Sequence, residues 1–85
     1  MSTIDMQVLE ERYEEHAHLL MDEMPTEEAA AIQAEIEELL ETCNTMVRLG
    51  TYRDRESGEY DLRYLAAFED AVTMLEDLAG YAMSW

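Results

Sequence analysis

The segment that determines the fold runs from Thr26 to Gly50 and reads TEEAAAIQAEIEELLETCNTMVRLG. Thr26 is a favourable N-cap, and the glutamates after it suit the positive end of a helix dipole. Gly50 stands where a left-handed residue commonly ends a helix, and Arg48 lies in the last turn. Between these ends, apolar side chains recur at helical spacing: Ile32, Ile36, Leu39, Leu40, Cys43, Met46 and Val47. We therefore predict an amphipathic helix over residues 26–49.

Two further amphipathic helices are predicted on either side of this segment. The first covers residues 3–24 and ends before Pro25, and the last covers residues 59–79 and ends before Gly80. Their apolar stripes are Met6, Leu9, Tyr13, Ala17, Leu20 and Met24 in the first, and Tyr64, Leu65, Phe68, Val72, Leu75 and Ala79 in the last, with Ala71 and Leu78 beside them. No stretch alternates long enough to predict a strand.

Three amphipathic helices with short connections predict an all-α fold, a small antiparallel three-helix bundle formed by one domain of residues 1–85. Some apolar residues lie off the predicted core stripes: Val8, Leu19, Leu49, Met74, Tyr81 and Trp85. They either widen the core or form a patch for a homodimer or a partner helix.

The net charge of −16 is the most unusual property of the chain, with 21 acidic residues against five arginines and no lysine. The acidic residues that we expect on the outer helix faces are Glu11, Glu15, Asp22, Glu37, Glu38, Glu41, Asp70 and Asp77. Carboxylates at i and i+4 rise about 6 Å along a helix, a spacing of the same order as that of a nucleic-acid backbone. Such rows favour a basic groove as partner; the alternative is a solvated face that serves only solubility.

In size, charge and helical form, the chain resembles the small nucleic-acid mimics with which phages and mobile elements counter host defence, such as anti-CRISPR and anti-restriction proteins. The resemblance implies a non-enzymatic inhibitor whose partner is a basic, nucleic-acid-binding protein or complex. The alternative function is a homo-oligomeric or adaptor subunit that assembles through exposed apolar side chains, for which the candidates are Val8, Leu19, Met74, Tyr81 and Trp85.

A remote alternative is a metal site in the stretch LEERYEEHAHLL, residues 9–20. Glu11, Glu15 and His18 stand at i, i+4 and i+7, so one helix face can present all three. Carboxylate-bridged metal centres need this pattern twice, and a homodimer would have to supply the second copy. These residues lie opposite the core stripe, in water, so we expect no metal and no other cofactor. His16, beside the core stripe, is predicted to be half-buried.

Several classes of function are disfavoured. There is no Gly-rich phosphate loop and no sign of a pocket that could raise the pKa of a carboxylate, so we expect no enzyme. Direct nucleic-acid binding is opposed by the charge. Four arginines do cluster around the second loop (Arg48, Arg53, Arg55 and Arg63), but we expect them to pair with the acids nearby: Asp54, Glu56, Glu59 and Asp61.

The expected compartment is the cytoplasm, of a bacterial or phage-infected cell if the resemblance holds. The N-terminal residues have no basic stretch followed by an apolar run, so no signal peptide is expected. No apolar segment approaches the roughly 18 residues that read as a membrane span, and an anionic membrane would repel this chain. The lone thiol of Cys43, predicted to be buried, fits a reducing compartment.

Overall fold

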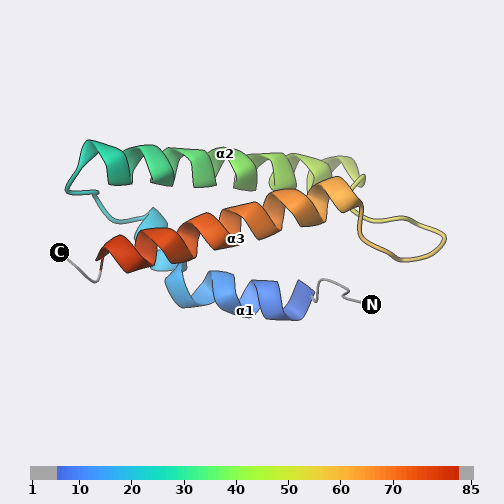
Figure 1. Cartoon of the computed structure of the whole chain (residues 1–85). Coiled ribbons are helices and arrows are strands. Elements are labelled where there is room, and N and C mark those ends of the chain that lie inside the picture. The colour runs from blue at the N-terminus through green and yellow to red at the C-terminus, as the bar shows by residue number, and fades with distance from the viewer. Residues whose placement is uncertain (1–5, 83–85) are drawn as a thin grey trace.

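The computed structural model describes residues 6–82. Its elements are α1 (Met6–His16), the 3₁₀ turn η1 (Ala17–Leu20), α2 (Glu27–Leu49) and α3 (Leu62–Ala82). Helices α1 and α3 run in the same direction, and α2 runs antiparallel to both (Figure 1). The predicted all-α three-helix bundle is confirmed.

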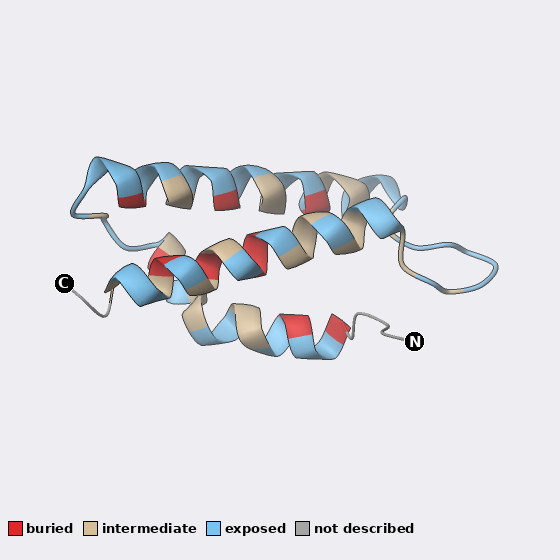
Figure 2. Ribbon diagram, viewed as in Figure 1, coloured by how far each residue is buried: buried red, intermediate tan, exposed pale blue. Residues whose placement is uncertain are grey.

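Helix α3 lies between the other two helices and packs against both of them (Figure 1). The described chain is elongated and flat, with principal extents of 47 × 27 × 16 Å. Buried positions lie on the facing sides of the helices, whereas the outer sides are exposed (Figure 2). The largest side chains that are completely buried are Ile36, Val72, Leu75 and Leu78. A layer this thin leaves many apolar side chains only half-buried.

The core consists of two clusters that share α3. One joins α3 to α2 and η1 and contains Leu19, Ala29, Ile36, Ala71, Leu75 and Leu78. The other joins α3 to α1 through Met6, Leu9 and Val72, with aromatic side chains packed around them. Because α3 has a neighbour on two sides, its buried arc is wider than that of α1 or α2 and includes Ala71 and Leu78 as fully buried positions.

The two ends of α2 follow the sequence prediction. The Thr26 hydroxyl oxygen accepts a hydrogen bond from the Ala29 backbone N–H at 3.1 Å, which satisfies one of the N–H groups that the first turn leaves without a partner. At the other end, Gly50 adopts φ 73°, and its N–H donates to the carbonyls of Met46 and Val47. A side chain at Gly50 would be strained in this left-handed conformation.

The first helix is shorter than predicted. Helix α1 ends at His16 instead of continuing to residue 24, and the chain tightens into the 3₁₀ turn η1. The side-chain amide of Gln33 on α2 donates to the Leu19 carbonyl at 2.9 Å and to the Asp22 carbonyl at 3.0 Å. Where the helix ends, the backbone supplies the Leu19 carbonyl with a long hydrogen bond of 3.4 Å from the Asp22 N–H, and a side chain distant in sequence adds shorter bonds to both carbonyls.

The 3₁₀ turn also corrects the expected exposure of Leu19, which is 6% exposed and belongs to the core. A 3₁₀ helix has 3.0 residues per turn against 3.6, so three residues of it rotate a side chain by about 60° relative to a continued α-helix. This rotation moves Leu19 from the flank of the predicted stripe toward α3.

Helix α3 is shifted relative to the predicted range of 59–79. It begins at Leu62, directly after Asp61, whose side-chain oxygen accepts a hydrogen bond from the Arg63 backbone N–H at 2.8 Å. It then passes through Gly80 and ends at Ala82. Gly80 does not adopt a positive φ, so it does not act as a terminator as Gly50 does.

The connection between α2 and α3 is an ordered hairpin. Arg53 and Tyr60 form an isolated antiparallel bridge, and Gly58 adopts φ 74° in the turn. The Arg53 guanidinium donates to the Gly58 carbonyl at 2.7 Å and lies 5.2 Å from the centre of the Tyr60 ring. The Asp54 carboxylate accepts the Glu56 backbone N–H at 2.7 Å. The loop is therefore shaped by its own polar side chains.

Aromatic rings form a continuous chain from α1 to this hairpin. The ring centres are 5.9 Å apart for Tyr13 and Phe68, 6.3 Å for Phe68 and Tyr64, and 5.8 Å for Tyr64 and Tyr60. The ring of Tyr52 joins this chain at Tyr64, at 5.5 Å. Tyr60, Tyr64 and Phe68 are stacked, with interplanar angles of 14° and 17° between neighbours. Each such pair stabilises the fold by about 0.5–1.5 kcal/mol beyond burial alone. The chain of rings attaches α1 and the loop to α3.

Candidate functional site

Carboxylates cover the outer surface of the described chain. Apart from Asp61, Glu69 and Glu76, every Asp and Glu in residues 6–82 is exposed. The predicted acidic positions are all among the exposed ones: Glu11, Glu15, Asp22, Glu37, Glu38, Glu41, Asp70 and Asp77. They nevertheless do not form one patch, because they belong to three helices and a turn that face different directions.

The placement of Asp22 differs from the prediction. It lies after η1, in the turn before α2, and so does not extend the α1 row of Glu11 and Glu15. On α2, Glu38 and Glu41 lie on the side that points away from α3, since buried Ile36 and Cys43 mark the opposite side of the helix. The outer row of α2 thus survives as predicted.

Two carboxylates in the described chain form ion pairs, and one of these pairs was expected from the sequence. Asp61 pairs with Arg63 at 3.3 Å. The other pair joins α1 to α3: the Arg12 guanidinium donates to both carboxylate oxygens of Glu76, with Nε 3.0 Å from Oε2. These hydrogen bonds lower the pKa of the Glu76 carboxyl. Arg12 lies 64 positions away in sequence, so no local spacing indicated this pair.

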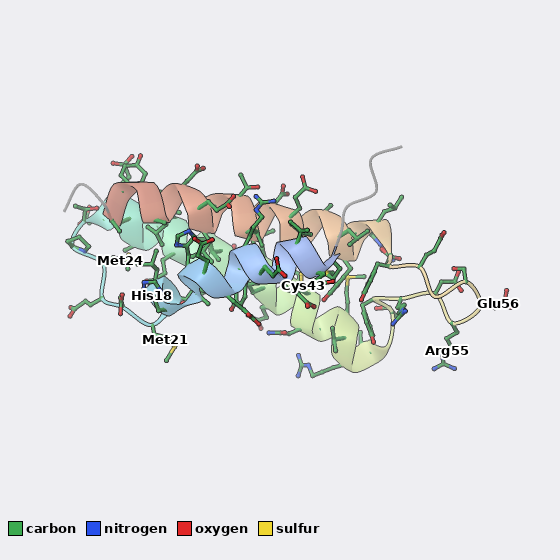
Figure 3. The ribbon with its side chains drawn as sticks, turned by 90° about the horizontal axis from the view of Figure 1, so that it is seen from below. His18, Met21, Met24, Cys43, Arg55 and Glu56 are labelled. Atoms are coloured by element: carbon green, nitrogen blue, oxygen red, sulfur yellow. The ribbon has the colours of Figure 1, made fainter. Side chains whose placement is uncertain are left out.

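The arginines around the second loop pair with acids less than predicted. Besides the Arg63–Asp61 pair, Arg53 binds the Gly58 carbonyl and the Tyr60 ring, and Arg48 contacts the Thr45 hydroxyl at 3.4 Å. Arg55 and Glu56 project from the tip of the loop (Figure 3). Arg53 thus stabilises the hairpin, Arg55 projects from its tip, and the arginines form no continuous basic surface.

The predicted apolar positions are distributed over the molecule. Leu19 is in the core, as described above; Val8 is 46% exposed on the outer side of α1, and Trp85 lies outside the described residues. Other large apolar side chains are exposed singly: Met21, which projects from the turn after η1 in Figure 3, and Val47, Leu49 and Leu62. These scattered positions do not make a patch.

Met74 and Tyr81 are brought together. They line an open pocket between α2 and α3 with Ile32, Gly80 and the acidic Asp77. Met74 is half-buried and packs against the core, whereas Tyr81 is 44% exposed. Here, members of the predicted acidic set and of the predicted apolar set meet in one site.

The metal candidates are not brought together. Because α1 ends at His16, His18 lies in η1, and the i, i+7 relation that would align it with Glu11 no longer holds. Within residues 6–82, no group of three His, Cys, Asp or Glu side chains is arranged to hold a metal ion. His16 is half-buried, as predicted, and lies beside Leu19 and Ala79 at the end of the bundle.

Cys43 is buried between the helices, as predicted (Figure 3). Its thiol lies 3.8 Å from the Tyr64 carbonyl, to which it donates, and burial raises its pKa. Since the thiolate is the reactive form, both effects make Cys43 a packing residue rather than a nucleophile.

The aromatic residues of the hairpin, Tyr52 and Tyr60, and the two α2 acids beside the pocket, Glu28 and Glu35, were not singled out as site residues from the sequence. The aromatic stack could have been recognised from the spacing of Tyr60, Tyr64 and Phe68, which stand at i, i+4 and i+8. Glu28 and Glu35, which stand at i−4 and i+3 from Ile32, became relevant only once Ile32 was found in the pocket.

No family of proteins, no characterised protein and no solved structure was found to match this chain. None of the helices in residues 6–82 is long and apolar enough to cross a membrane. The function is therefore inferred from the surface of the molecule.

Proposed function

We propose that this chain is a non-enzymatic protein that binds a basic, nucleic-acid-binding partner through its carboxylate-bearing helix faces, in the manner of the nucleic-acid mimics used by phages. The observation that carries the proposal is the state of the carboxylates. In the described chain they are almost all exposed, and only Glu76 and Asp61 are in ion pairs. The negative charge is thus available to a partner instead of being neutralised within the fold.

The shape supports the same function. The helices are long relative to the thickness of the molecule, and Glu38 and Glu41 belong to an uninterrupted helix of 23 residues. Rows of carboxylates on a rigid rod present fixed negative charges to a groove that neutralises phosphates. Charge of one sign also steers diffusional encounter with an oppositely charged surface, so association is expected to be fast and sensitive to salt.

Self-assembly is favoured less. Leu19, one of the apolar positions on which that alternative depended, is in the core. Two copies of a chain with net charge −16 also repel each other wherever their acidic faces approach.

The test is a pull-down with the immobilised protein from a nuclease-treated bacterial lysate, with captured proteins identified by mass. We expect a nucleic-acid-binding protein that is released as salt rises from about 50 mM to about 200 mM and is displaced by duplex DNA. Capture of no such protein, or of proteins that neither salt nor DNA displaces, would contradict the proposal.

A charge-reversed variant locates the contact. Changing Glu11, Glu15, Glu38 and Glu41 to Lys is expected to abolish capture while the circular dichroism of the helices persists, since all four side chains are exposed. Two double variants give a matched comparison. One combines Glu38→Lys and Glu41→Lys on α2, and the other combines Glu56→Lys and Glu59→Lys in the loop. Both double variants have the same net charge, so a stronger effect of the first pair shows that the helix face binds.

A further inference from the structure

The α2–α3 pair has two flanks, and α1 covers one of them. On α2, the buried residues Ala29, Ile36 and Cys43 recur every seven positions and face α3. Gln33 lies to one side of this line and bonds to η1, so that side faces α1 and its continuation. Ile32 lies to the other side and lines the pocket with Met74. We call this second side the open flank.

The open flank has a regular apolar floor. Its residues recur every seven positions on both helices: Ile32, Leu39 and Met46 on α2, and Ala67, Met74 and Tyr81 on α3. All of them are half-buried except Tyr81, which is exposed. A heptad repeat keeps side chains on one side of a helix over several turns, and two facing repeats form a seam into which another helix can pack. From Ile32 to Met46, this seam is about 21 Å long.

Acidic side chains border the floor on both helices. Glu28 and Glu35 stand at i−4 and i+3 from Ile32, and Asp70 and Asp77 stand at i−4 and i+3 from Met74. Residues at these spacings are neighbours on a helix surface, and all four of these carboxylates are exposed. The open flank therefore combines an apolar seam with a rim of negative charge.

The pocket at one end of the open flank fits a long cationic side chain. It has a volume of about 480 Å³ and is lined by Ile32, Met74, Asp77, Gly80 and Tyr81. The apolar walls can contact the aliphatic stem of an arginine, while the Asp77 carboxylate and the Tyr81 ring can bind its guanidinium. The absence of a side chain at Gly80 keeps the wall open, with no heavy atom within 4 Å of a Cβ placed there.

We propose that the open flank is the docking surface for a cationic amphipathic helix of the partner, with an arginine of that helix in the pocket. This inference rests on the proposed function, which requires a basic partner, and it adds one docking surface and one element of the partner to the contacts made by the outer acidic faces. A second copy of the chain is a poorer occupant, because it would bring net charge −16 against the acidic rim.

The test uses two synthetic peptides of identical composition, about 18 residues or roughly 27 Å as a helix, built from leucine, lysine and one arginine. In the first peptide, the leucines follow the i, i+3, i+4, i+7 pattern; in the second, the same residues are scrambled to destroy the apolar face. We expect the amphipathic peptide to bind at least about tenfold more tightly, because it alone can bury an apolar face in the seam. NMR shifts should concentrate at Ile32, Leu39 and Met74 and spare Val72.

Matched variants separate the seam from general charge. Leu39→Gln and Met74→Gln are each expected to weaken binding of the amphipathic peptide by about tenfold and to leave the affinity for the scrambled peptide unchanged. Asp70→Asn with Asp77→Asn should weaken binding of the amphipathic peptide more than Glu56→Gln with Glu59→Gln in the loop, although both double variants remove the same charge. Thermal melting of each variant verifies that the bundle is folded.

Two results would overturn the proposal: equal affinities for the two peptides, or self-association at high salt that Leu39→Gln abolishes, which would assign the open flank to a second copy. Either result leaves the proposed function standing if the DNA-sensitive capture from lysate is observed. Conversely, peptide binding in the seam without any such capture would contradict the proposed function and leave the docking surface intact.

Discussion

The two flanks of the α2–α3 pair differ in how their apolar side chains are covered. On the flank that faces α1, Gln33 holds the η1 turn, Val72 is buried by Met6 and Leu9, and Arg12 reaches across to Glu76. On the open flank, Ile32, Leu39 and Met74 remain half-buried, and carboxylates border them. Polar contacts thus complete the fold on one flank, whereas the carboxylates that border the other flank are exposed.

Equal amphipathic stripes therefore need not have equal partners. The apolar arc of α3 is wide enough for two neighbours, and α1 occupies only part of the available surface. Mutations on the two flanks should accordingly affect different properties, stability on the covered flank and binding on the open one.

The largest loss is expected where α2 meets α3, because both flanks depend on this contact. Ile36→Ala and Leu75→Ala each truncate a fully buried side chain. Each should lower the free energy of unfolding by about 2–5 kcal/mol, through lost burial and the cavity left behind. Urea unfolding followed by circular dichroism measures the loss. Leu49→Ala, at a position 71% exposed, is the control and should change stability by less than about 0.5 kcal/mol.

A smaller loss is expected from the covered flank alone. Gln33→Ala removes both hydrogen bonds to the carbonyls of Leu19 and Asp22 and should cost about 1–2 kcal/mol. Amide exchange in residues 17–24 should become faster, while exchange in the middle of α3 should change little. Glu35→Ala, on the open flank of the same helix, is the matched control. An equal loss for both variants would contradict the distinction between the flanks.

Salt should stabilise the fold through the exposed carboxylates. Raising the ionic strength from about 0.01 M to about 0.1 M shortens the screening length from about 30 Å to about 10 Å. Relief of self-repulsion of about 1 kcal/mol would raise Tm by about 4–8 °C in a chain of this size. Changing Glu28 and Glu35 to Gln should reduce this response. A melting temperature that falls with salt would show that attractive pairs dominate the surface.

The smallest effect is expected at the ion pair between α1 and α3. The Arg12 and Glu76 side chains are each 37% exposed, so solvent screening limits the pair to about 0.5 kcal/mol. The pKa of Glu76 is lowered from its usual value of 4.5 in the folded state. The stabilisation is therefore present above pH 4.5 and is lost as the pH falls through the depressed pKa.

Glu76→Gln tests this pH dependence. It should cost about 0.5 kcal/mol at pH 7 and progressively less in acid, until the variant and the native chain have the same stability. Urea titrations at a series of pH values measure the difference. A difference that does not decrease in acid would assign the effect of the substitution to packing instead of charge.

The elements whose signals are local could be predicted from the sequence. The N-cap at Thr26 and the left-handed Gly50 bound α2 as predicted, since both act through hydrogen bonds within a few residues. The apolar stripes also identified the three helices and most of the core. The exposed carboxylates follow from the same periodicity, because residues opposite a buried stripe face solvent.

The features that depend on distant contacts followed from the packing of the helices. Helix α1 ends at His16 and Leu19 becomes buried where Gln33, on another helix, binds the carbonyls of the turn. The Arg12–Glu76 pair and the meeting of Ile32, Met74 and Tyr81 in one pocket likewise join separate helices. Periodicity gives the direction of a side chain relative to its own helix. Which neighbour lies in that direction, and whether any does, is fixed by how the helices pack.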